Sequence, residues 1–295
     1  MFPDFLPKLT ETLTEATSIA FSKNIDRQPI KTPLTSQPIA TTFLRQGKGG
    51  IPILLLHGFD SSLLEYRRLF PLLAANNETI AVDLLGFGFT ERLPELTISP
   101  QAISTHLYSF WQSLINRPII LVGASMGGAA AIDFTLNYPE IVTKLILIDP
   151  AGATGGPPLG KYLFPPLGYL ATSFLRSPKV RQKISENAYF DKSFASLDAQ
   201  ICAALHLETK DWDKGLISFT KSGGYRPFGK KLAEIQQPSL ILWGEYDKIL
   251  GTADAVKFEK GLPNSELIWI KNSGHVPHLE RPEIVAEHIL EFIAN

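Results

Sequence analysis

Ser125 lies among glycines in the segment VGASMGGAAA, residues 122–131. The apolar run before it is typical of a buried strand, and the run of small residues after it is compatible with a closely packed helix. A serine at a tight strand-to-helix turn is held in a strained conformation with its hydroxyl exposed, and its neighbours must be small. Gly123 and Gly127 occupy the positions two before and two after it. The segment therefore predicts a nucleophile elbow with Ser125 as the nucleophile.

A serine hydroxyl is a weak nucleophile unless a base takes its proton, and that base is usually a histidine oriented by a carboxylate. His275 is the predicted base, because it lies in a loop, NSGHVPHLERPE, between the last predicted strand and the last predicted helix. Asp247 is the predicted acid, since it follows a strand in the turn GEYDKIL. Asp149, which follows the preceding strand, is the alternative. The chain order serine, acid, histidine is the order of one hydrolase architecture.

Two backbone amides are predicted to form an oxyanion hole, which stabilises the charge that develops on an attacked carbonyl oxygen. They belong to Phe59, in ILLLHGFDSS, and to Met126, directly after the serine. These groups together predict acyl transfer to water, a reaction that requires no cofactor. The sequence has no HExxH motif and no paired cysteines, so we expect no metal site.

Short apolar runs alternate along the chain with segments of helical period, which is the pattern of a mostly parallel sheet covered by helices on both faces. Helices are predicted from Pro100, with Ser99 as the N-cap, from about residue 63, and from Pro282. The predicted strands are residues 42–44, 53–56, 80–82, 119–122, 145–148, 240–243 and 267–270.

This alternation stops between Asp149 and Gln237, where prolines, glycines and helical patches replace strands. We therefore expect a sheet domain formed by residues 1–152 and 226–295, with a helical extension over residues 1–28, and a helical insertion over residues 153–225. The insertion contains an unusually apolar patch. As the lid of a cleft, this patch would suit a lipophilic ester. Its predicted substrate-binding residues are Phe164, Leu167, Leu170 and Phe174.

Composition excludes several classes of partner. The formal net charge of -1 provides no attraction for nucleic acid. A single cysteine, Cys202, cannot form an internal disulfide, and no apolar stretch reaches the length of a membrane span. We therefore expect a cytoplasmic protein that acts on a small-molecule ester, with peripheral lipid contact through the N-terminal helix and the apolar patch as an alternative. No oligomeric state is predicted.

From about Thr35 onwards the chain resembles the α/β-hydrolase fold family, through the motifs LLLHGF, VDLLGFGFT, LVGASMGGAAAIDFTLNYPE, LILIDPAG, LILWGEYDKIL and SGHVPHLERPE. The resemblance implies an α/β-hydrolase fold with a helical cap, or lid, inserted after the sixth core strand. It also implies a Ser125, Asp247 and His275 triad and an oxyanion hole at Phe59 and Met126. The first thirty or so residues match no family motif.

The same resemblance narrows the expected activity. Haloalkane dehalogenases and epoxide hydrolases of this fold need an aspartate where this chain has Ser125, and carbon-carbon bond hydrolases typically have tryptophan where it has Val276. The expectation is therefore a serine esterase, similar to carboxylesterases and lipases, that forms an acyl-serine intermediate. The alternatives are a carbon-carbon bond hydrolase or a lactonase of the same fold, and a non-catalytic or slow-turnover ligand receptor or scaffold.

Overall fold

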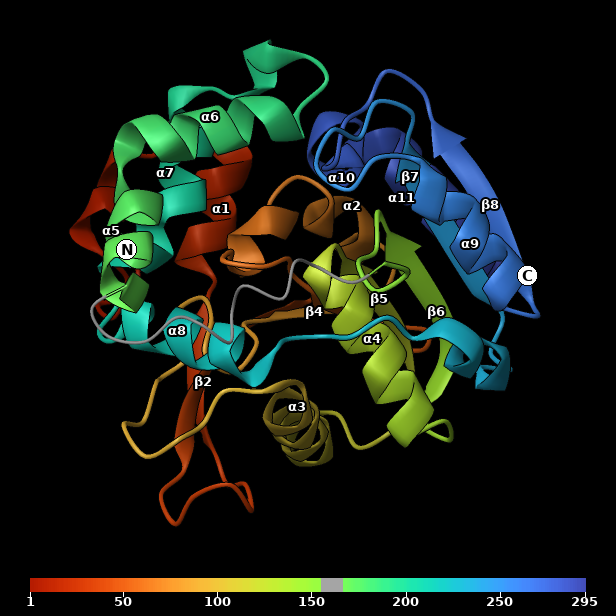
Figure 1. Cartoon of the computed structure of the whole chain (residues 1–295), viewed down its shortest axis with the longest axis horizontal. Helices are drawn as coiled ribbons and strands as arrows, with labels where there is room; N and C mark the ends of the chain where they lie inside the picture. Colours follow the sequence, from red (N-terminus) through yellow and green to blue (C-terminus); the bar gives the residue numbers. More distant parts are fainter. Residues whose placement is uncertain (155–166) are drawn as a thin grey trace.

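An eight-stranded sheet runs through the centre of the molecule (Figure 1). The computed structural model describes residues 1–154 and 167–295. The strand order is β1-β2-β4-β3-β5-β6-β7-β8, and only the pairs β1/β2 and β2/β4 are antiparallel. The predicted mostly parallel sheet is confirmed, and each predicted strand falls within an observed one. The strands are β1 Asp26–Ile30, β2 Ile39–Gln46, β3 Ile53–Leu56, β4 Thr79–Val82, β5 Ile119–Ala124, β6 Val142–Ile148, β7 Ser239–Gly244 and β8 Ser265–Ile270.

Strand β1 is not predicted from the sequence. It forms the edge of the sheet and pairs with β2 alone. Of its five residues, DRQPI, only Ile30 is buried, so no alternation of apolar and polar residues marks it as a strand. Pro29 lacks an N–H group, which an edge strand tolerates because one side of its backbone has no partner strand.

Helices cover both faces of the sheet. On one face α3, α4 and α9 bury residues such as Phe110, Phe134 and Phe258, and on the other α2 and α11 bury Phe70 and Ile289. The helix predicted from Pro100 is confirmed with its cap, because the Ser99 hydroxyl accepts the Ala102 amide at 3.2 Å. These helices are α2 Phe70–Ala74, α3 Pro100–Leu114, α4 Met126–Asn137, α9 Ala253–Gly261, α10 Pro277–Glu280 and α11 Pro282–Ala294, with the 3-10 helix η6 Gly229–Glu234 before β7.

The prediction of one continuous helix from about residue 63 is wrong, because two separate helices occupy this segment. A 3-10 helix, η2, covers Leu63–Tyr66, and the α-helix α2 begins only at Phe70. Pro71 lies in the first turn of α2, where its missing N–H leaves no hydrogen bond unmade. In one continuous helix the same proline would remove an internal hydrogen bond, so the chain starts a new helix at this point.

A helical insertion, α5–α8, separates β6 from β7 and gathers at one end of the molecule (Figure 1). The described residues between these two strands contain no strand, as the sequence predicts. The insertion consists of α5 Leu167–Arg176, α6 Pro178–Ala188, η4 Lys192–Phe194, α7 Leu197–Ala204, η5 Leu205–Glu208 and α8 Trp212–Ser222.

The N-terminal segment forms η1 Lys8–Thr12 and α1 Ala16–Lys23 and packs beside the insertion. Asp198 of α7 ties the two together, because its carboxylate accepts the amides of Thr14 and Glu15, at 2.7 and 2.8 Å, and the Ser18 hydroxyl at 2.6 Å. Phe21 of α1 packs against Phe70, so the apolar side of this helix faces the protein. Within residues 1–154 and 167–295, no helix combines the length and the apolar character that crossing a membrane requires.

Candidate active site

Ser125 stands at the turn where β5 ends and α4 begins. Its backbone has φ 52° and ψ -118°, in the left-handed region that side chains rarely adopt. Hydrogen bonds on both sides hold this strained turn: the Ser125 amide donates to the Ile148 carbonyl at 2.9 Å, and its own carbonyl accepts the Gly128 amide at 3.0 Å. The turn lifts the side chain above the carboxyl ends of the strands.

The two elbow glycines are required by close backbone contacts. A Cβ atom at Gly123 would lie 2.2 Å from the carbonyl oxygen of Gly127, and one at Gly127 would lie 2.0 Å from that of Leu56. Backbone atoms this close cannot be avoided by rotating a side chain, so any other residue would displace the turn that carries Ser125.

Gly127→Ala should therefore lower the free energy of unfolding by about 3 kcal/mol, because overpacking against backbone forces the turn and α4 apart. Urea unfolding measures this directly. Gly168→Ala on α5 is the control, since its Cβ would meet only the end of the Ile217 side chain, at 3.2 Å. A Gly127→Ala protein as stable as the Gly168→Ala protein would contradict the explanation.

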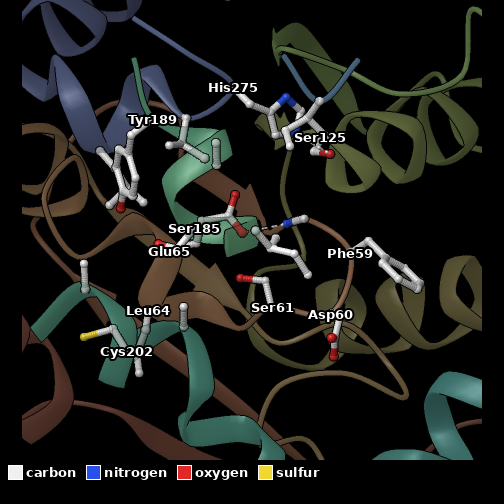
Figure 2. Close-up of a pocket in the computed structure, with 18 of the residues that line it drawn as sticks. Phe59, Asp60, Ser61, Leu64, Glu65, Ser125, Ser185, Tyr189, Cys202 and His275 are labelled. Atoms are coloured by element: carbon white, nitrogen blue, oxygen red, sulfur yellow. Dashed lines mark hydrogen bonds between the residues drawn. The ribbon is translucent and has the colours of Figure 1, made fainter. Parts of the chain in front are cut away.

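His275 connects Ser125 with Asp247 (Figure 2 shows Ser125 beside His275). Its Nε2 lies 3.0 Å from the Ser125 hydroxyl, and its Nδ1 lies 2.8 Å from Asp247 Oδ2. With the proton on Nδ1, the imidazole donates to the carboxylate and accepts from the hydroxyl, which is the arrangement that a general base needs. Three residues distant in the chain thus form one hydrogen-bonded series.

Asp247 is positioned to stabilise a positive charge on the His275 imidazole. Its Oδ1 accepts the amides of Ile249 and Leu250, at 2.7 and 3.0 Å, while Oδ2 faces His275. Burial raises the pKa of Asp247, but the His275 hydrogen bond and these amides outweigh burial and lower the pKa below its ordinary value. Asp247 is therefore ionised at neutral pH.

Asp149, the alternative acid, lies in the same cluster without bonding to His275. It is fully buried with φ 40°, and its Oδ1 accepts the Gly244 amide at 3.0 Å. Burial, and next the nearby Asp247, raise its pKa well above the ordinary value, which favours the protonated form of this carboxyl group. Ligand atoms of Asp149, Asp247 and His275 lie within 4.8 Å of one another. A fully buried carboxyl group with a raised pKa and an imidazole already bonded to a carboxylate are, however, a poor donor set for a metal ion.

The two predicted oxyanion donors lie on either side of Ser125. Gly58, just before Phe59, passes so close that a Cβ there would be 3.4 Å from Ser125 Cβ, and Met126 is the first residue of α4. Neither the Phe59 amide nor the Met126 amide has a hydrogen-bond acceptor among the described residues. Both amides are therefore free to donate to a bound oxygen atom.

A buried glutamate that the sequence analysis did not single out holds this turn. Glu65 Oε2 accepts the Gly58 amide at 2.9 Å, and Oε1 lies 3.1 Å from His278 Nε2. Burial raises the pKa of Glu65, but the His278 hydrogen bond and the Gly58 amide outweigh it, and the pKa falls to about 2. Nothing in the local sequence indicates this contact, because Glu65 lies in an amphipathic stretch typical of any surface helix.

Glu65→Gln should flatten the acid end of the stability profile. A folded pKa of about 2 against the ordinary 4.5 means that the carboxylate stabilises the protein above pH 4.5 and that this stabilisation is lost as the pH falls towards 2. The difference corresponds to about 3 kcal/mol. Urea unfolding from neutral to acidic pH should show this loss in the wild type and in Glu283→Gln, an exposed control, but not in Glu65→Gln. Equal pH dependence in all three would contradict the assignment.

Asp60 ties the same turn to the helical insertion. It has φ 48°, and its carboxylate accepts Arg181 Nη1 at 2.7 Å, Trp212 Nε1 at 2.8 Å and His206 Nε2 at 3.1 Å. These partners come from α6, α8 and η5, which are 121–152 residues away in sequence. This network cannot be predicted from the sequence, because local patterns carry no information about contacts between such distant residues.

Glu280 likewise joins the loop that carries His275 to the helical insertion. Its carboxylate accepts the amide of Gly274, at 2.6 Å, and that of Asp191 in the insertion, at 2.9 Å. The His275 amide in turn donates to the Ala188 carbonyl at 2.7 Å. The loop that presents His275 is therefore fixed by the insertion as well as by the sheet.

A cavity of about 290 Å³ lies beside Ser125 and His275 (Figure 2). Its surface is mostly apolar. The insertion contributes residues of α6 and α7 and the residue after α6 to the wall, and the core contributes the rest. The apolar lining residues are Phe59, Leu64, Ile184, Ala188, Tyr189, Ala199, Cys202, Ala203, Ile249, Val276 and Leu279.

The predicted substrate-binding residues do not line this cavity where the structure describes them. Leu170 and Phe174 are 62% and 64% exposed, because α5 turns Gly168 and Thr172 inward, on its other side. Leu170 and Phe174 were expected to contact the substrate, but residues of α6 and α7 line the cavity instead. Phe164 and the side chain of Leu167 lie outside the described residues.

The chain belongs to the α/β hydrolase family, whose sequence profile matches residues 53–288. It is 33% identical to the alpha/beta hydrolase domain-containing protein VTE7 of Arabidopsis thaliana, over 100% of this chain and 91% of that protein. It is also 29% identical to a 2-hydroxy-6-oxononadienedioate/2-hydroxy-6-oxononatrienedioate hydrolase of Escherichia coli, over 84% and 89% of the two chains. A thermophilic esterase from Thermogutta terrifontis has the same fold, with a TM-score of 0.78 over 91% of this chain and 98% of that one at 24% identity. The protein is therefore a hydrolase of this family.

Proposed function

We propose that the protein is a serine esterase with Ser125, His275 and Asp247 as its catalytic triad. Ser125 attacks the ester carbonyl while His275 takes its proton, and the amides of Phe59 and Met126 stabilise the oxyanion. The imidazolium then protonates the leaving alcohol. In the second half of the reaction His275 takes a proton from water, the water oxygen attacks the acyl-serine, and the proton passes to Ser125 as the acid leaves. The observation that carries this proposal is the hydrogen-bonded series from Asp247 through His275 to Ser125, at 2.8 and 3.0 Å, beside two free amides.

The proposed substrate is an ester with an apolar body. Apolar side chains supply most of the cavity surface, and a cavity of about 290 Å³ holds a small apolar group rather than a polymer. Residues 153–225 are proposed to form the cap over this cavity, with residues 1–152 and 226–295 as the hydrolase core. The contacts of Asp60 and Glu280 with the insertion support this division, since they join the cap to both catalytic loops.

Cleavage of a carbon-carbon bond is the second candidate, because the Escherichia coli relative is named a hydrolase of 2-hydroxy-6-oxononadienedioate, a compound without an ester bond. Carbon-carbon and ester hydrolysis can be compared on one purified protein, using a vinylogous diketone that has a carboxylate and a p-nitrophenyl alkanoate of similar length. Faster turnover of the ester supports the proposal, and turnover of the diketone alone would overturn it. A cyclic lactone in the same assay tests the lactonase alternative.

A ligand receptor or scaffold is the candidate from another class. A fluorophosphonate probe reacts only with a serine that is activated by its base and oxyanion donors. We expect stoichiometric labelling at Ser125, identified by peptide mass spectrometry, together with multiple turnovers of the ester. Labelling without turnover would favour a receptor, and no labelling would contradict the proposed alignment of the triad.

A further inference from the structure

One arginine in the cavity wall has an incomplete set of partners. Arg67, directly after η2, is only 2% exposed and lines the cavity beside Ser125. Its Nε and Nη2 groups have no hydrogen-bond partner among the described residues, and Nη1 makes one long bond of 3.4 Å, to the Leu64 carbonyl. A guanidinium carries five N–H donors, so most of its hydrogen-bonding capacity here is unused.

No described carboxylate bonds to the Arg67 guanidinium. Tyr189 and Cys202 lie close to it and line the same cavity, and burial raises the pKa of each, so both are neutral. The nearby carboxylate of Glu15 is taken by Arg68, with bonds of 2.6 and 2.8 Å. A buried positive charge without a partner costs free energy, which an anion bound beside it recovers.

The other acidic and arginine side chains of the cavity wall are already paired. Asp60 bonds to Arg181 at 2.7 Å, and Glu65 lies 3.1 Å from His278. Within the described wall of the cavity, Arg67 is therefore the one arginine without a carboxylate partner.

Arg67 adjoins the side chains of Tyr189 and Cys202. Figure 2 shows Tyr189 and Cys202, its two neighbours, at the other side of the pocket from Ser125. The surface between them is largely apolar, with Leu64 and Ala199 among the lining residues. A ligand that spans the cavity would thus meet the hydroxyl at one end, an apolar stretch in the middle and the guanidinium at the other end.

We infer that Arg67 binds a carboxylate of the substrate, at the end remote from the scissile ester, so that the substrate class is an apolar ester with a second, ionised carboxyl group. A guanidinium recognises carboxylates by paired, charge-assisted hydrogen bonds. This inference rests on the proposed esterase activity and specifies its substrate.

Matched esters test it. One series consists of p-nitrophenyl hemiesters of straight-chain dicarboxylic acids, from succinate to suberate, each compared with its neutral methyl diester. A second series places the carboxylate on the alcohol side, as 4-carboxyphenyl alkanoates compared with 4-(methoxycarbonyl)phenyl alkanoates. In at least one series we expect the charged ester to have a kcat/KM about tenfold or more above its neutral partner, as a charge-assisted hydrogen bond would give.

Arg67→Met should abolish this preference while the neutral esters are still cleaved, and Arg226→Met, whose arginine is exposed and does not line the cavity, should keep it. Arg67→Met should also melt at the same temperature as the wild type or higher, since it removes an unpaired buried charge. Arg67→Lys keeps the charge and serves as the second variant should Arg67→Met not fold.

The inference is overturned if neutral and charged esters are equally good in both series, or if Arg67→Met keeps the preference. If no ester is cleaved, the esterase proposal fails by itself. The inference that Arg67 binds a carboxylate is then tested with free suberate. It is supported if suberate raises the melting temperature of the wild type but not that of Arg67→Met, and it is overturned otherwise.

Discussion

Ser125→Ala should lower kcat/KM for a p-nitrophenyl ester by about 10⁴-fold or more, with little change in stability. The variant lacks the nucleophile, so no acyl-serine intermediate forms, and only the oxyanion donors and substrate binding still act on the ester. The side chain makes a single described hydrogen bond, with His275, so its removal costs the fold little. Steady-state rates, fluorophosphonate labelling and thermal unfolding measure the three effects.

Ser185→Ala is the matched control, because Ser185 supplies a second hydroxyl to the same cavity from α6. We expect it to keep most of the activity and all of the labelling. If Ser125→Ala turned over the ester at a rate within a few fold of Ser185→Ala, the acyl-serine mechanism would have to be abandoned.

Asp247→Asn should lower kcat/KM by about 10³ to 10⁴-fold. The amide keeps the shape of the side chain but cannot stabilise the imidazolium, and its NH₂ group favours the wrong tautomer of His275. KM should change little, because Asp247 does not line the substrate cavity. Ile249 and Leu250 still have an oxygen to donate to, so the turn should persist.

Asp149 gives this variant a distinctive pH profile. Besides burial, the negative charge of Asp247 raises the pKa of Asp149, so Asp247→Asn removes one of the causes and lets Asp149 ionise at lower pH. An ionised Asp149 within 4.8 Å of His275 can partly replace the lost charge. The residual rate of Asp247→Asn should therefore rise more steeply with pH than that of Asp149→Asn/Asp247→Asn, in which only His275 is left to respond to pH.

Asp149→Asn alone should have a small effect, since the Asp149 carboxyl group does not bond to His275. Near-complete loss in that single variant, with Asp247→Asn active, would reverse the assignment of the two acids. Identical pH profiles for Asp247→Asn and the double variant would show that Asp149 does not act as a substitute.

Most of the sheet could be predicted because buried parallel strands are continuous apolar runs, as in ILLL of β3 or SLILWG of β7. β1 could not, because an edge strand buries little and its polar residues leave no periodic signal. The break between η2 and α2 was also hidden: Leu63, Tyr66, Phe70 and Leu73 have helical spacing, and all are buried, although the backbone between them is not one helix.

Some features of the active site are predictable from the sequence and others are not. The glycines around Ser125 could be interpreted from sequence, because the close contact of Gly123 with Gly127 lies within five residues of chain. The apolar patch on α5 misled the prediction of the cavity wall, because composition does not tell which side of a helix faces inward. Leu170 and Phe174 face out, and Ile184 and Tyr189 from the next segment line the cavity instead.

Local sequence patterns are sufficient to predict the strands β2–β8, the turn at Ser125 and the order of the serine, the acid and the histidine along the chain. These depend on sterics and burial among near neighbours, which leave a local pattern. The folded structure is needed to show which carboxylate contacts His275, that Glu65, Asp60 and Glu280 hold the catalytic loops, and that Arg67 has no carboxylate partner in the cavity wall. Such contacts join residues far apart in the chain, and their energies depend on burial and distance, which folding alone establishes.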